Sequence, residues 1–237
     1  MKHVSSFFIN SNTNTGEASM KKFLSLIALV LIFTTGAHAD NEAGKNYEIT
    51  VTNLTRGQSF TPILVATHKE GVSLFTEGSP ASPELALLAE SGNTAPMAAA
   101  LGANANVYDV TTIPGLLAPG KSVTVKVKME GKFDHVSMAA MLIPTNDGFF
   151  ALNGIQGPKG QKMLSLESLA YDAGSEPNDE LCINIPGPVC GGEGASPYAD
   201  GEGFVHIHAG IHGIGNLSAA ERDWRNPVAN ITIRRVP

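Results

Sequence analysis

Features that would identify a common enzyme or a heavily cross-linked scaffold are largely missing from this sequence. Its 237 residues include two cysteines and one tryptophan, and only 6% of them are aromatic. There is no Gly-x-Ser-x-Gly elbow, no His-Glu-x-x-His motif and no phosphate-binding glycine loop. These absences exclude the familiar hydrolase and nucleotide-binding signatures, so we predict no catalytic residues and no enzymatic activity.

Long hydrophobic runs are also missing. The longest apolar stretch, residues 23–33, is eleven residues long, whereas a membrane-spanning helix needs about 18 or more. This stretch follows Met20-Lys21-Lys22 and is succeeded by Ala37-His38-Ala39, which is the pattern of a cleaved secretory signal. We therefore predict a signal peptide at residues 20–39 with Met20 as the initiator, and no membrane span in the mature form.

Positive charge is scarce as well. The whole chain carries a formal charge of −6, and removal of residues 1–39 takes away Lys2, Lys21, Lys22 and Glu17 and leaves −8. Such a balance argues against nucleic acid or an anionic membrane surface as the partner. It is compatible with the binding of divalent cations.

The two cysteines both lie within the predicted mature chain. Cys182 and Cys190 enclose a short segment that contains Pro and Gly, and in an oxidising compartment such a pair is expected to form a disulfide. A zinc-binding or reactive pair would usually have a two-residue spacing or a second pair elsewhere. The pattern therefore favours a structural disulfide between Cys182 and Cys190.

Apolar residues alternate with polar ones in several segments, as expected for half-buried strands. A short helix is predicted at residues 83–90, with Ser82 as its N-cap and Gly92 as its stop, and a second helical piece at 96–101. Strands without a regular strand–helix alternation favour an antiparallel sandwich. We predict a single all-β domain at residues 40–237 with short helical insertions, and its expected strands are 47–54, 59–68, 122–128, 135–143, 149–152, 204–208 and 228–236.

Several motifs spread over almost the whole mature chain resemble the spondin N-terminal domain. The most specific are the Pro-x-x-Asp turn that ends at Asp147 and the Asp-Ala-Gly-x-acid motif from Asp172 to Glu176; the others are Leu74-Phe75-Thr76-Glu77-Gly78, Ala81-Ser82, Leu88-Ala89-Glu90-Ser91-Gly92-Asn93 and Ser137-Met138. The resemblance implies a C2-like antiparallel sandwich of about eight strands, with a calcium ion at one end. In animals the family serves recognition in the extracellular matrix and at cell surfaces.

The resemblance also implies the calcium ligands, namely Asp147, Asp172 and Glu176. The family commonly has Asp at the last of these positions, so the longer Glu176 side chain changes the reach of that ligand. The three acids also suit a hard cation on chemical grounds, because Ca²⁺ takes six to eight oxygen ligands and the neighbouring small residues leave backbone carbonyls accessible. Mg²⁺ fits less well because it demands near-octahedral geometry. The alternative is that these are ordinary solvated loop acids.

A second constellation lies in the segment 206–212. His206 and His208 would project from the same face of a strand, and His212 would join them if Gly210 bends the chain. Converging imidazoles suit zinc or copper, although hydrogen-bonded histidines near a strand end would give the same pattern.

Two functions therefore stay open. The first is an exported, periplasmic or extracellular, calcium-binding recognition or adhesion module with a structural ion, whose partner is an extracellular or envelope protein or a glycan. The alternative is a transition-metal-binding protein or metalloenzyme built on His206, His208 and His212.

Overall fold

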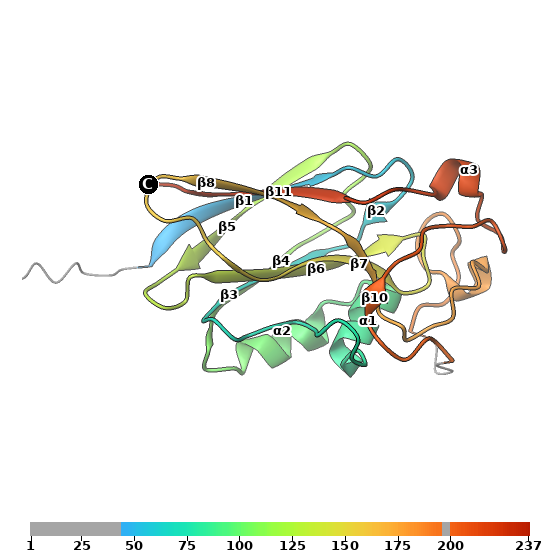
Figure 1. Cartoon of the computed structure of the whole chain (residues 1–237), viewed down its shortest axis with the longest axis horizontal. Coiled ribbons are helices and arrows are strands. Elements are labelled where there is room, and N and C mark those ends of the chain that lie inside the picture. Colours follow the sequence, from blue (N-terminus) through green and yellow to red (C-terminus); the bar gives the residue numbers. More distant parts are fainter. Residues whose placement is uncertain (1–43, 196–199) are drawn as a thin grey trace, which may run out of the picture. The chain divides into compact units, whose positions relative to one another are not determined.

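The computed structural model describes residues 44–195 and 200–237 (Figure 1). The predicted signal peptide, residues 20–39, and the residues before it lie outside this part. No helix among the described residues is both long enough and apolar enough to cross a membrane.

The described chain forms two antiparallel β-sheets, which confirms the predicted all-β class (Figure 1). The four-stranded sheet has the order β5 (Ser122–Met129), β1 (Lys45–Asn53), β11 (Ala229–Arg235) and β8 (Met163–Ser168). The seven-stranded sheet has the order β10 (His206–Ile207), β9 (Ala170–Asp172), β7 (Gly148–Gln156), β6 (His135–Ile143), β3 (Ile63–His68) and β4 (Val107–Ile113), and β2 (Ser59–Phe60) pairs with β6. The eight strands β1, β3, β4, β5, β6, β7, β8 and β11 have six or more residues, in agreement with the predicted number.

The main core fills the space between the two sheets. On β1 the side chains of Tyr47, Ile49 and Val51 are buried while the residues between them are half exposed. They pack with apolar residues of both sheets, including Met138 and Phe150 of the seven-stranded sheet. The four-stranded sheet thus packs its apolar face on the larger sheet and turns its other face to solvent. This explains why buried and more exposed residues alternate along β1 and β5.

The larger sheet is covered on its second face by two helices, α1 (Pro83–Ser91) and α2 (Ala95–Gly102). The second core cluster joins Leu85 and Leu88 of α1 to Leu64 and Phe149 of the sheet. Burial on both faces explains why β6 is an almost continuous apolar run. The α1 boundaries agree with prediction, since the Ser82 hydroxyl accepts from the Leu85 N–H and the helix ends on a left-handed Gly92.

Two predicted strands differ from the structure. The segment predicted as one strand at 59–68 is divided into β2 and β3 by Thr61 and Pro62, because proline has no N–H to donate to a ladder. Its second half, β3, lies inside the sheet between β6 and β4. The strand predicted at 204–208 is reduced to β10, which pairs only with β9.

A polar network inside the larger sheet contains a neutral histidine. His68 is fully buried, and its Nδ1 lies 2.8 Å from the Lys69 carbonyl, which can only accept. Nε2 is therefore the acceptor for the Ser137 hydroxyl at 2.8 Å, and Ser137 Oγ in turn accepts the Gly154 N–H. Burial lowers the pKa of His68, the bond to the Lys69 carbonyl raises it, and the nearby His135 lowers it further.

This network predicts a loss of stability in mild acid. Because the pKa of His68 is lower in the folded than in the unfolded chain, the unfolded chain takes up more protons, so stability is complete above about pH 6.5 and falls as the pH drops below that value. The free energy of unfolding, from urea titrations between pH 7 and 5, should fall more steeply for wild type than for His68→Gln, by up to about 1.4 kcal/mol per pH unit. His212→Gln, at an exposed position, should keep the wild-type slope. Equal slopes for wild type and His68→Gln would contradict the prediction.

Candidate metal centre

Two loops meet at one end of the larger sheet and bring the predicted acidic ligands together. Asp147 ends the turn between β6 and β7, and Asp172 is the last residue of β9. Strands β7 and β9 are paired with Gly148 opposite Asp172, and the Ala173 N–H donates to the Asp147 carbonyl at 3.2 Å. Sheet pairing therefore places these two residues, 25 apart in sequence, on adjoining chain segments.

Asp147 is completely buried, and its two carboxylate oxygens have different surroundings. Oδ2 accepts the backbone N–H of Ser175 at 2.8 Å and of Glu176 at 3.0 Å, and the Ser175 hydroxyl at 3.2 Å. Oδ1 is buried and has no hydrogen-bond donor. Hydrogen bonds to Oδ2 thus attach the carboxylate to the loop 173–176, while Oδ1 has no hydrogen-bond donor.

Asp172 is also completely buried. Its Oδ1 accepts the Gly174 N–H at 2.8 Å, and its Oδ2 accepts the Asn178 side-chain N–H at 2.6 Å. The third predicted ligand, Glu176, is 1% exposed, and its N–H donates to Asp147 as described. The structure therefore buries all three predicted acids on one pair of adjoining loops, so they are not exposed to solvent. In the described chain, however, the ligand atoms of Asp147 and Glu176 do not form with Asp172 a group that lies within 4.8 Å of one another.

The electrostatics of this cluster are unfavourable in the absence of a cation. Burial raises the pKa of Asp147 to about 8, with a further contribution from the charge of Asp172. Burial likewise raises the pKa of Asp172, against the lowering effect of the bonds from Asn178 and Gly174. Among the described residues no Lys or Arg forms an ion pair with Asp147 or Asp172. A bound cation would supply the missing positive charge.

The loops are held by a second set of polar groups that no sequence motif indicated. Asn146 accepts the Glu180 N–H and donates to Asp179. The Glu180 carboxylate accepts three consecutive backbone N–H groups, from His212 at 2.5 Å, Gly213 at 2.7 Å and Ile214 at 3.0 Å. Glu180 is therefore a structural carboxylate that joins the segment after the acids to the segment after β10.

The predicted histidines divide into two kinds. His206 and His208 both face Asp172, with Nδ1 of His206 3.8 Å from Oδ1 and Nε2 of His208 4.0 Å from Oδ2. His212 is exposed, and its N–H is bound by Glu180. The three imidazoles thus do not surround one point.

The hydrogen bonds of His208 disfavour it as a metal ligand. Its Nδ1 accepts the Gly210 N–H at 2.9 Å, so in the neutral ring Nε2 carries the proton. Burial, together with the charges of His206 and His212, lowers the pKa of His208 to about 4. His206 differs because its Nδ1 lies 3.1 Å from the Phe204 carbonyl, which leaves Nε2 as an acceptor.

A further acid, Glu202, joins this region. Ligand atoms of Asp172, Glu202 and His206 all lie within 4.8 Å of one another, and this is the single group of potential metal ligands of that kind found in the described chain. Glu202 also accepts from Asn178 at 3.3 Å. Glu202 is far from Asp172 in sequence and lies in a glycine-rich loop. No sequence motif therefore indicated that it belongs to this region.

Comparison with known proteins agrees with this architecture. The Spondin_N family model matches residues 32–176. The chain belongs to the Spondin_N family. No curated protein is similar enough to the chain to count as a match.

Spondin_N is an extracellular and non-catalytic type of domain. The matched region ends at Glu176 and so includes all three predicted calcium ligands, whereas the histidines from His206 onward lie beyond it. The predicted disulfide between Cys182 and Cys190 is confirmed. It links the first residue of the 3₁₀ helix Cys182–Asn184 to the loop that follows this helix. That helix is tied back to Asp179 through Asn184, so the disulfide lies in the same bracing network as Glu180.

Glycine at position 174 is required by two features of the site. Its φ is +64°, and a Cβ atom there would lie 2.3 Å from the Phe204 carbonyl oxygen. We expect Gly174→Ala to lower the free energy of unfolding by about 3 kcal/mol or more, because the left-handed backbone and the displacement of the Phe204 backbone both cost energy. Gly120→Ala is the control, with a φ of +68° and no atom within 4 Å of the added Cβ, and should cost only about 1 kcal/mol. Equal losses in urea denaturation would contradict the close packing at Gly174.

Proposed function

We propose that this Spondin_N protein is an exported calcium-binding recognition module in which Asp147, Asp172 and Glu176 hold a structural ion. The observation that carries the proposal is the Asp147 Oδ1 atom, which is buried without a hydrogen-bond donor beside a second buried carboxylate. A buried carboxylate in this state is costly for the fold, and a divalent cation is the group that would remove the cost.

The donor set supports calcium over softer metals. The atoms offered by Asp147, Asp172 and Glu176 are carboxylate oxygens, which are the preferred ligands of hard cations. Calcium also accepts variable numbers of ligands at flexible angles, and this suits a site whose acids are already held by backbone N–H groups. When bound, the ion would supply positive charge that neutralises the acids.

The ion's proposed role is to join the β6–β7 turn to the loop after β9. Asp147 belongs to the first and Asp172 and Glu176 to the second, so one ion would fix the relative position of both loops at this end of the sandwich. Loops that are positioned by a rigid scaffold commonly carry recognition. Export is supported by the predicted signal peptide, by the disulfide and by the extracellular type of the family domain.

Asp147→Asn tests the proposal with two readouts that move in opposite directions. Burial raises the pKa of Asp147 to about 8, so at pH 8.5 most of the wild-type carboxyl is ionised. Without metal, in EDTA at this pH, the variant should melt at or above the temperature of wild type, because the amide removes this buried charge. With calcium at a hundred times its dissociation constant, wild type should gain about 2.7 kcal/mol, or about 5–10 °C, and the variant should gain almost nothing.

The control for this experiment is Glu70→Gln, which removes one negative charge from an exposed turn at the opposite end of the sheet. It should keep the full response to calcium. The proposal is wrong if wild-type protein stripped with EDTA shows no change in melting temperature and no heat on titration with millimolar calcium.

A second candidate function is supported by the group Asp172, Glu202 and His206. One imidazole and two carboxylates are ligands that zinc also accepts, and we propose transition-metal binding there as the alternative to calcium. This site would use His206 alone, whereas the sequence predicted a site formed by His206, His208 and His212 together.

Elemental analysis of protein purified without chelators separates the two functions. If the alternative is right, zinc or copper should be stoichiometric and should be lost in His206→Gln, while the exposed control His212→Gln should retain it. If calcium binding is right, neither histidine variant should change the metal content, and Asp147→Asn should abolish it. Stoichiometric zinc that survives His206→Gln would contradict the alternative.

A further inference from the structure

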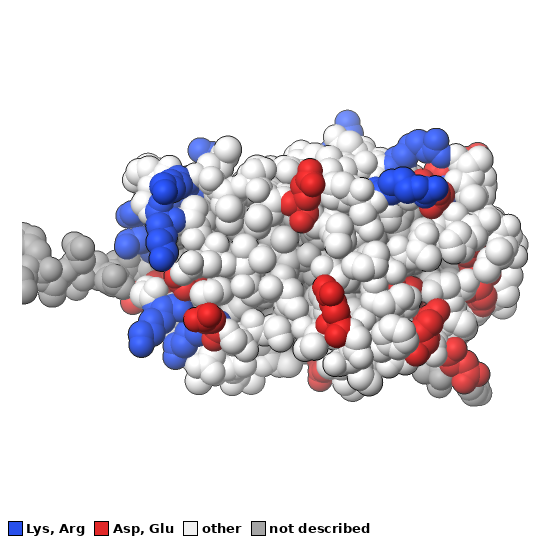
Figure 2. Space-filling view, viewed as in Figure 1, with Lys and Arg blue, Asp and Glu red and all other residues white. Residues whose placement is uncertain are grey.

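A group of Lys and Arg side chains of this acidic protein gathers at the end of the sandwich that lies opposite the acidic loops. Figure 2 shows this group at the end where, in Figure 1, β1 begins and the chain terminates, and a smaller blue group at the upper right of the view. They come from the start of β1, the turn after β3, the β5–β6 and β7–β8 loops and the end of β11. Those that concern the argument are Lys45, Lys69, Lys132, Lys159 and Arg235. The net charge of the chain conceals this local excess.

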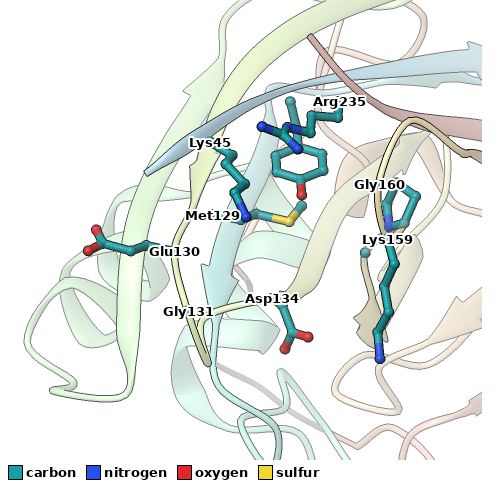
Figure 3. Close-up of a pocket in the computed structure, with 11 residues that line it drawn as sticks. Lys45, Met129, Glu130, Gly131, Asp134, Lys159, Gly160 and Arg235 are labelled. Carbon is teal, nitrogen blue, oxygen red and sulfur yellow. The ribbon is translucent and has the colours of Figure 1, made fainter. Parts of the chain in front are cut away.

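A hollow of about 200 Å³ lies within this basic end. In Figure 3 Lys45 and Arg235 extend over one side of it from β1 and β11, and Lys159 lies on the opposite side, on the β7–β8 loop. Tyr47 and Met129 form part of its wall. Three cations from three separate segments thus surround one cavity.

The acids near the hollow do not neutralise these cations. Glu130 points away from the cavity (Figure 3) and is hydrogen-bonded to Tyr108. Asp134 accepts from His135 Nδ1 at 2.9 Å and from Gln156 Nε2 at 2.8 Å. Among the described residues, Lys45, Lys159 and Arg235 have no ion pair. Their charge is therefore available to a ligand.

A second hollow of about 520 Å³ adjoins the first, since Gly131 and Asp134 line both. It is lined by two more cations, Lys69 and Lys132, and besides Asp134 by the exposed acid Glu70. Cations in two neighbouring cavities match successive negative charges along an extended chain better than a single small anion.

We propose that this basic end binds a linear acidic polysaccharide, with one sulfate or carboxylate group held between Lys45 and Arg235 and further groups running toward Lys132. A bilayer surface fits less well, because the cations lie around hollows and none of the exposed large apolar side chains of the described chain lines either one. An added peptide strand fits less well too, because strand ends rather than unpaired strand edges surround the cavities.

The test measures binding of the purified protein to dextran sulfate, polygalacturonate and neutral dextran by fluorescence titration in EDTA, so that calcium does not contribute. We expect binding to one or both charged polymers, which identifies the group as sulfate or carboxylate, and none to dextran. The affinity should fall steeply with salt. The double variant Lys45→Gln/Arg235→Gln should bind about tenfold more weakly, with a salt dependence reduced by about two charges.

The matched control is Lys121→Gln/Arg56→Gln. It removes the same charge from exposed residues at the other end of β1, roughly 25–30 Å away by the length of the strand, and it should bind as wild type does. Thermal melting of both variants should match wild type. Failure of both charged polymers to bind, equal weakening in the control, or equally tight binding to phosphatidylglycerol vesicles would each overturn the proposal. Because metal is absent throughout, the result is independent of calcium binding at the acidic end.

Discussion

The end of the sandwich that carries the acids depends on one constraint, the burial of the Asp147 carboxylate next to Asp172. Sheet pairing between β7 and β9 forces the two together, and backbone N–H groups satisfy only one oxygen of Asp147. Both residues are completely buried, so water does not solvate the carboxylates. The fold therefore stores an electrostatic cost at this point, which protonation or a cation would relieve. Natural folds keep such a cost chiefly where it serves a site.

The surroundings of the acids explain how that cost is tolerated. Gly148 brings the His208 ring against the backbone beside Asp147, since a Cβ there would lie 2.8 Å from the ring. Glu180 holds three consecutive N–H groups of the segment after β10, and the Cys182–Cys190 disulfide closes the loop just beyond it. Loop, disulfide and buried carboxylate thus add to the β7–β9 pairing in holding the acids in position. Rigid ligands of this kind lower the entropy lost when an ion binds.

Much of the architecture was predictable because its signals are local. Alternation in β1, β5 and β11 identified three strands of the smaller sheet, and the Ser82 cap with Gly92 identified α1. The strands β4, β8 and β9 were missed: β4 and β8 each have one buried residue, and β9 is three residues long. Asp147 and Asp172 were recognisable from motifs, whereas Glu202 and Glu180 were not, since tertiary contacts alone bring them to the site. The His206 and His208 prediction was limited in another way, because ring tautomers depend on partners such as Gly210 that no sequence pattern indicates.

The same reasoning applies to charge. A net formal charge of −6 argues against polyanionic partners only if the charges are evenly mixed, and here they are not. Strand β7 leads directly from Asp147 at the acidic end to Gly157 in the basic hollow, so the two ends are separated by the length of a single strand, several Debye lengths at physiological salt. Each end therefore acts on ligands almost independently of the other. A protein with this arrangement can hold a cation at one end and a polyanion at the other, with the rigid two-sheet core fixing the distance between them.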